Sequence, residues 1–122
     1  MIRRSLALLA VMVAAGGLLC AQCKGGGPGF RSRQQFEEHY AKHGREFGGI
    51  TKDHYLCLAQ QLRDAAAGGA ILQLVREDGV ISRFDRRKGY FGAYNRDRTI
   101  RTFFIPNDGE RYFQRQARRS TR

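Results

Sequence analysis

The spacing of hydrophobic residues changes near residue 69 of this chain. Before that point, two segments place apolar side chains three and four positions apart, which is typical of helices packed on one face. The first begins after Ser32 and stops at Gly44; the second begins after Thr51 and stops at Gly68 and Gly69. Ser and Thr are favoured helix N-caps, and Gly ends helices. The pattern therefore predicts two helices in the first half of the domain.

After residue 69 the apolar segments become short and rich in β-branched and aromatic residues, which predicts strands at 70–76, 80–85, 90–94 and 99–105. Short polar connections between them indicate antiparallel hairpins. Residues 110–118 fit either a fifth strand or a closing helix. We therefore expect an α+β fold in which two N-terminal helices pack on one face of a four- or five-stranded antiparallel sheet, leaving the other face open for a site.

The first 21 residues have the form of a secretory signal peptide. Arg3 and Arg4 precede an apolar stretch that is short for a membrane span, and cleavage after Ala21 is expected. An uncleaved membrane anchor and a lipoprotein attached through Cys20 are the alternatives. Residues 22–29 then form a Gly-rich tail, 30–118 the domain, and 119–122 a basic tail. This organisation predicts a secreted or periplasmic monomer without stable membrane association after cleavage.

Removal of the signal segment would leave two cysteines, Cys23 and Cys57. In an oxidising compartment, a pair of cysteines is more often a disulfide than a metal site. The alternative is a buried free thiol at Cys57. A bridge would tie the N-terminal tail to the second helix.

The charge balance favours a polyanionic partner. The chain has 22 Lys and Arg against 11 Asp and Glu, a net charge of +11, and most of the cations are arginines, which bind phosphate with two hydrogen bonds. The sheet half carries most of this excess, interleaved with aromatic rings that can stack on bases. RNA is the partner we expect, with Arg83, Arg96 and Arg98 as nucleic-acid-binding residues. No P-loop, dinucleotide fingerprint or paired CxxC motif is present, which argues against an NTPase, a Rossmann oxidoreductase and a zinc ribbon.

Two of the three histidines, His39 and His43, lie one helical turn apart, whereas His54 fits a surface position. The pair could hold zinc, but no third ligand is evident, so we expect neither a metal nor a cofactor. A structural role for His43 at the helix C-terminus is the alternative.

Metal-free RNA cleavage requires a base, an acid and groups that stabilise the phosphorane. His39 and His43 can supply the base and acid, Arg101 can bind phosphate, and Thr102 and Tyr112 can donate hydrogen bonds. Strand alternation places Arg101 and Thr102 on opposite faces unless a bulge intervenes, with Thr102 beside Ile100 and Phe104.

A set of short motifs over residues 36–114 resembles the toxin nucleases grouped with barnase, EndoU, colicin and RelE. The motifs are His39-Tyr40, Lys42-His43-Gly44, Glu46-Phe47-Gly48, Tyr55 with Ala59, Arg83-Phe84-Asp85, Gly92, Ile100 to Phe104 with Pro106, and Tyr112-Phe113. Such domains are found at the C-termini of polymorphic and contact-dependent inhibition toxins. The resemblance implies metal-independent endoribonuclease activity, often on transfer RNA, with His39, His43, Arg101, Thr102 and Tyr112 in the site.

Two functions therefore stay open. One is a secreted metal-independent ribonuclease, either antagonistic or scavenging, for which an acidic immunity protein or inhibitor would be a partner. The other is a non-catalytic secreted domain that holds RNA or another polyanion on its arginine-rich sheet.

Overall fold

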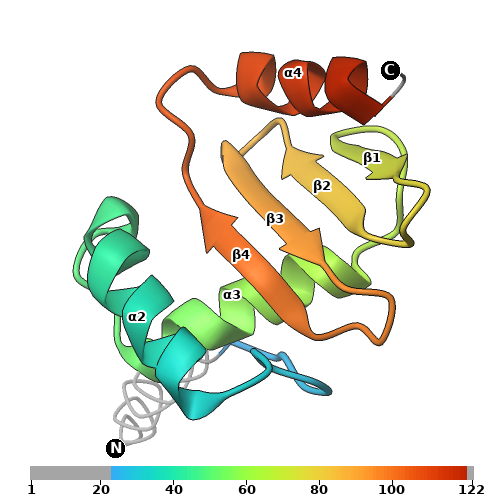
Figure 1. Ribbon diagram of the computed structural model, residues 1–122. Coiled ribbons are helices and arrows are strands. Elements are labelled where there is room, and N and C mark those ends of the chain that lie inside the picture. The colour runs from blue at the N-terminus through green and yellow to red at the C-terminus, as the bar shows by residue number, and fades with distance from the viewer. Residues whose placement is uncertain (1–22, 121–122) are drawn as a thin grey trace, which may run out of the picture.

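The computed structural model describes residues 23–120, which fold into three α-helices and a four-stranded sheet (Figure 1). The helices are α2 (Arg33–His43), α3 (Lys52–Asp64) and α4 (Glu110–Ser120), with a short 3₁₀ helix, η2 (Gly44–Phe47), after α2. None of the helices in this described part of the chain is long and apolar enough to cross a membrane. The predicted signal peptide, residues 1–21, lies outside the described residues.

Both predicted N-caps are present. The Ser32 hydroxyl accepts a hydrogen bond from the Gln35 amide, and the Thr51 hydroxyl accepts one from the His54 amide, each at 3.1 Å. Gly44 follows α2 as expected, but with right-handed backbone angles. Glycine is needed there because a Cβ atom would lie 2.7 Å from the Tyr40 ring.

The sheet is an antiparallel meander. Strands β1 (Ile71–Val75), β2 (Ile81–Asp85), β3 (Tyr90–Tyr94) and β4 (Ile100–Phe104) lie side by side in chain order. Each strand pairs antiparallel with the next. The predicted α+β class and the hairpin connections are confirmed, with four strands.

Helices cover both faces of the sheet. The α3 face carries a core of fully buried side chains that includes Tyr55, Tyr94 and Phe103, and Figure 1 shows α3 running behind the strands. On the opposite face, Phe113 of α4 packs against Phe84 and Phe91. Of the two alternatives for residues 110–118, the closing helix is present and the fifth strand is not. The expectation of an open sheet face is wrong, because this third helix, which follows the sheet, packs Phe113 on that face.

A register shift between Ala93 and Tyr94 marks a bulge opposite the first residues of β4. Ala93 pairs with Thr102, whereas Tyr94 pairs with Ile100, so Arg101 is the extra residue. Ile100 consequently joins Phe103 in the α3 core instead of sharing a face with Thr102 and Phe104, as strict alternation predicts. The bulge directs the Arg101 side chain toward α2, as described below.

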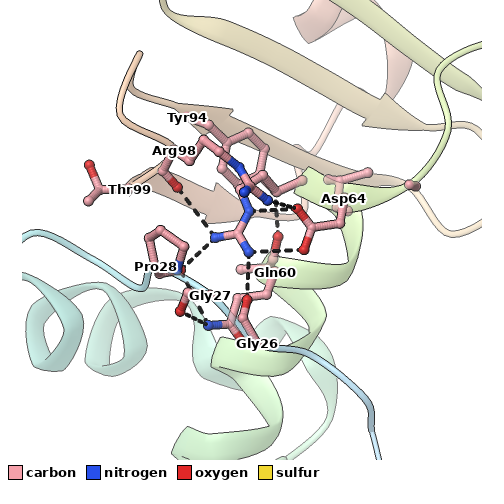
Figure 2. Close-up of polar contacts among 12 residues, drawn as sticks. Gly26, Gly27, Pro28, Gln60, Asp64, Tyr94, Arg98 and Thr99 are labelled. Carbon is pink, nitrogen blue, oxygen red and sulfur yellow. Dashed lines mark hydrogen bonds and ion pairs between the residues drawn. The ribbon is translucent and has the colours of Figure 1, made fainter.

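Residues 23–31, which we call the N-terminal strap, run along α3 and reach β4. The predicted Cys23–Cys57 disulfide is present, with Cα atoms 6.1 Å apart. Such a bridge is typical of proteins in oxidising compartments. Figure 2 shows strap carbonyls of Gly26 and Pro28 gathered around a guanidinium group beside Asp64 and Arg98. That group belongs to Arg63, whose side chain is 4% exposed.

Candidate active site

A polar hollow of about 350 Å³ lies where α2 meets the β4 edge of the sheet. We call it the His39 hollow. Its lining residues come from the strap, α2, the β3–β4 connection and β4: Arg31, Gln35, Glu38, His39, Asn95 and Arg101. The sequence predicts two of them, His39 and Arg101, as site residues, and the fold brings these two together across 62 positions of the chain.

His39 contacts two aromatic rings. Its imidazole stacks on Phe30 with a centroid distance of 5.1 Å and on His43 at 6.1 Å. Its Nδ1 atom is buried and has no hydrogen-bond partner among the described residues. Burial lowers the pKa of His39, nearby His43 and Lys42 lower it further, and Glu38 opposes them. The ring is therefore neutral near pH 7, the form that accepts a proton.

His43 is fixed by a carboxylate. Its Nδ1 lies 2.9 Å from Glu46 Oε2, while Glu46 Oε1 accepts a hydrogen bond from the Ile105 amide at 2.9 Å. The ring also stacks on Phe104 at 5.1 Å. With Nδ1 engaged, Nε2 is the nitrogen that remains for proton exchange. Glu46 is a site residue that the sequence pattern does not single out, although a carboxylate three residues after a histidine at a helix end is a usable signal.

Arg101 is held at the hollow by Asn95. The Arg101 Nη1 atom donates to Asn95 Oδ1 at 3.2 Å, and the Asn95 amide group donates to Thr99 Oγ1 at 3.0 Å. The Arg101 side chain is exposed on its other side. No carboxylate among residues 23–120 pairs with the Arg101 guanidinium, so Arg101 can bind a phosphate that enters the hollow.

Thr102 and Tyr112 lie on the α4 face, outside the lining of the hollow. Thr102 pairs with Ala93. The Phe104 ring lies between Tyr112 and His43: its centroid is 5.2 Å from that of Tyr112 and 5.1 Å from that of His43. Arg115 lies over the Tyr112 ring at 5.6 Å. The two residues can therefore contact only a substrate that extends from the hollow past Phe104.

The three arginines expected to bind nucleic acid differ in position. Arg83 is 9% exposed, and its guanidinium donates to the Leu62 carbonyl at 3.1 Å, to the Ala65 carbonyl and to Gln73 Oε1. It caps the C-terminus of α3 from inside the protein, so the expectation of a phosphate contact does not fit its position. Arg96 and Arg98 are exposed in the β3–β4 connection, where Arg98 donates to Asp64 at 2.5 Å.

Across residues 23–120, no three His, Cys, Asp or Glu side chains gather in a way that could hold a metal ion. The hollow itself offers a neutral imidazole and an exposed guanidinium, and beside it lies a second imidazole, His43, which a carboxylate orients and which stacks on His39. Those are the groups of acid–base catalysis on a phosphate ester.

No model of a known protein family matches the chain, and no curated protein matches its sequence.

Proposed function

We propose that this protein is a metal-independent endoribonuclease. The observation that carries the proposal is the pairing, in one polar hollow, of the neutral His39 imidazole with the exposed Arg101 guanidinium, one helical turn from a histidine fixed by Glu46. The residues come from α2, η2 and β4 and meet only in the folded chain. Their chemistry agrees with the resemblance to toxin ribonucleases.

In the proposed reaction, His39 accepts the proton of a ribose 2′-hydroxyl, and the 2′-oxygen attacks the adjacent phosphorus. The bond between phosphorus and the 5′-oxygen breaks, and His43 gives that oxygen a proton from Nε2. The products are a 2′,3′-cyclic phosphate and a free 5′-hydroxyl. Arg101 stabilises the extra negative charge on the phosphorane. Thr102 and Tyr112 contact the strand beyond Phe104.

The compartment and biological role follow from this activity and the disulfide. A disulfide-bonded ribonuclease fits a secreted or periplasmic protein, and RNA is its substrate. Its role is then either antagonistic or scavenging, and an antagonistic enzyme would be matched by an acidic inhibitor. The basic chain, with a net charge of +11, is complementary to both RNA and such an inhibitor.

The test is cleavage of a fluorogenic RNA in the presence of EDTA, compared with the same oligonucleotide carrying 2′-O-methyl groups. We expect the RNA to be cut and the methylated strand to stay intact, because the 2′-hydroxyl is the nucleophile. RNA that is bound but not cut would contradict the enzyme and support the alternative, a non-catalytic polyanion-binding domain.

Glu46→Gln should lower the rate of cleavage by at least about tenfold, with little change in KM. Because the Ile105 amide needs the oxygen of the new carboxamide, the NH₂ group faces His43 Nδ1 and donates a hydrogen bond there, which leaves a neutral ring with its proton on Nε2. A neutral imidazole is a much weaker acid than an imidazolium. Steady-state kinetics of the variant measure this effect.

Glu77→Gln, which changes an exposed carboxylate in the β1–β2 turn, is the matched control and should keep the wild-type rate. An unchanged rate for Glu46→Gln would show that His43 needs no carboxylate to act.

A further inference from the structure

We propose that the N-terminal strap positions a residue of the His39 site. Phe30 fixes the His39 ring, and the Cys23–Cys57 disulfide holds Phe30 in place. The expected effect on RNA cleavage rests on the proposed function. The expected effect on the position and pKa of the His39 ring does not.

One end of the strap is anchored to α3 by several contacts. Besides the disulfide, Arg63 donates to the carbonyls of Pro28 at 2.5 Å and Gly26 at 2.6 Å (Figure 2). Gln60 donates to the carbonyls of Gly27 and Pro28 at 3.2 Å and 3.3 Å. At Gly25 the strap lies so close to α3 that a Cβ atom would meet Gln60 Oε1 at 2.7 Å.

The other end of the strap enters the site. The Gly29 carbonyl accepts a hydrogen bond from the Ile100 amide at 2.9 Å, immediately before Arg101. The next residue, Phe30, stacks on His39 at 5.1 Å and packs against Phe36 at 5.7 Å. Arg31 then lines the His39 hollow. The strap therefore supplies one wall of the hollow.

Phe30 can influence His39 in two ways. It fixes the plane of the imidazole by stacking, and it shields the ring from water on that side, which favours the neutral ring. The charged and titratable groups around His39 are Glu38, Lys42 and His43 on α2, Arg31 on the strap and Arg101 on β4. Removing the Phe30 ring, or releasing the strap, exposes His39 to water and raises its pKa.

The disulfide makes this arrangement sensitive to thiols. A dithiol such as dithiothreitol gives up two electrons and two protons, forms its own cyclic disulfide and leaves Cys23 and Cys57 as free thiols. Cys23 is partly buried and Cys57 is buried, so we expect a thiolate to attack the bridge from the Cys23 side. The strap would then hold Phe30 against His39 outside the cell and release it in a reducing cytosol.

The first experiment follows the His39 pKa by NMR titration in the wild-type protein, Phe30→Ala, Phe30→Tyr and Cys23→Ser. We expect Phe30→Ala and Cys23→Ser to raise it toward the ordinary histidine value of about 6.5, while His43 and Lys42 still lower it, and Phe30→Tyr, which keeps a ring, to leave it unchanged. Val75→Ala, at an exposed position of β1, is the control and should change nothing.

A folded Phe30→Ala protein with an unchanged His39 pKa would overturn the role of Phe30. An unchanged value in folded Cys23→Ser would overturn the role of the disulfide.

Gly27→Ala provides a second variant if Cys23→Ser does not fold. Gly27 has a φ of +80°, and a Cβ there would lie 2.9 Å from Arg63 Nη2, so alanine displaces the strap while the disulfide stays intact. It should also raise the His39 pKa, and an unchanged value would contradict the strap model.

The second experiment measures RNA cleavage in EDTA. Phe30→Ala and the reduced wild-type protein should cut about tenfold more slowly or worse, with the rate recovered in Phe30→Tyr and after reoxidation. The NMR result stands even if the wild-type protein cuts no RNA, so failure of the strap proposal and failure of the ribonuclease proposal are distinguishable.

Discussion

His39→Ala should lower the single-turnover rate of RNA cleavage by roughly a hundredfold to ten-thousandfold, the usual effect of losing a general base. The ring it removes is the neutral imidazole of the hollow, and among the described residues that line the hollow no other side chain titrates near neutrality. RNA affinity should change little, because Arg101 remains in place. Rapid-mixing cleavage assays and a binding titration on the same protein separate the two effects.

His54→Ala is the matched control for this substitution. His54 is exposed in the first turn of α3, and its side chain is not among those that line the hollow. The control should cut RNA at the wild-type rate. A loss of the same size in both variants would mean that the assay reports the removal of any histidine, and the assignment of His39 would fail.

Arg63→Met should cost about 3 kcal/mol of the free energy of unfolding. Methionine fills a similar volume but leaves the carbonyls of Gly26, Pro28 and Arg98 without their common donor, and removes the two contacts to Asp64 at 2.9 Å and 3.0 Å. The substitution therefore loosens the strap, α3 and the β3–β4 connection together. Urea denaturation followed by circular dichroism measures the loss.

The control for Arg63→Met is Arg87→Met in the exposed β2–β3 turn, where we expect a change within about 0.5 kcal/mol. A loss below about 1 kcal/mol for Arg63→Met would show that water replaces the guanidinium at these carbonyls.

The elements that local chemistry determines were predictable from the sequence. Ser32 and Thr51 cap their helices as expected, and β-branched and aromatic runs became the four strands of an antiparallel meander. Residues 110–118 were ambiguous because the pattern around Tyr112 and Phe113 fits both a strand and a helix. The helix is explained by tertiary packing, because Phe113 of α4 covers the apolar sheet face that Phe84 and Phe91 form.

Tertiary effects account for what the sequence could not predict. Arg63 and Arg83 look like part of a basic surface, yet both guanidinium groups are buried against backbone carbonyls. The bulge in β4 follows from Ile100 and Phe103 both packing in the α3 core, which no alternation rule anticipates. Net charge therefore overstated the arginines available to a ligand.

The sequence singled out the candidate acid, base and phosphate-binding residues of the site, but not the residues that hold them in place. The i, i+4 spacing singled out His39 and His43, and the basic strand singled out Arg101. Phe30 and Asn95 became part of the site through contacts across long chain separations, with Phe30 on His39 and Asn95 on Arg101. Thr102 and Tyr112 lie on the α4 face, farther from the hollow than a single compact site would place them.

The most direct test is single-turnover RNA cleavage in EDTA by a His39→Ala/His43→Ala double variant whose fold is checked by circular dichroism. The proposed mechanism predicts a folded protein that still binds RNA and cuts it at least about a hundredfold more slowly than wild type. A folded double variant that cuts RNA at the wild-type rate would contradict the mechanism and remove α2 from the active site.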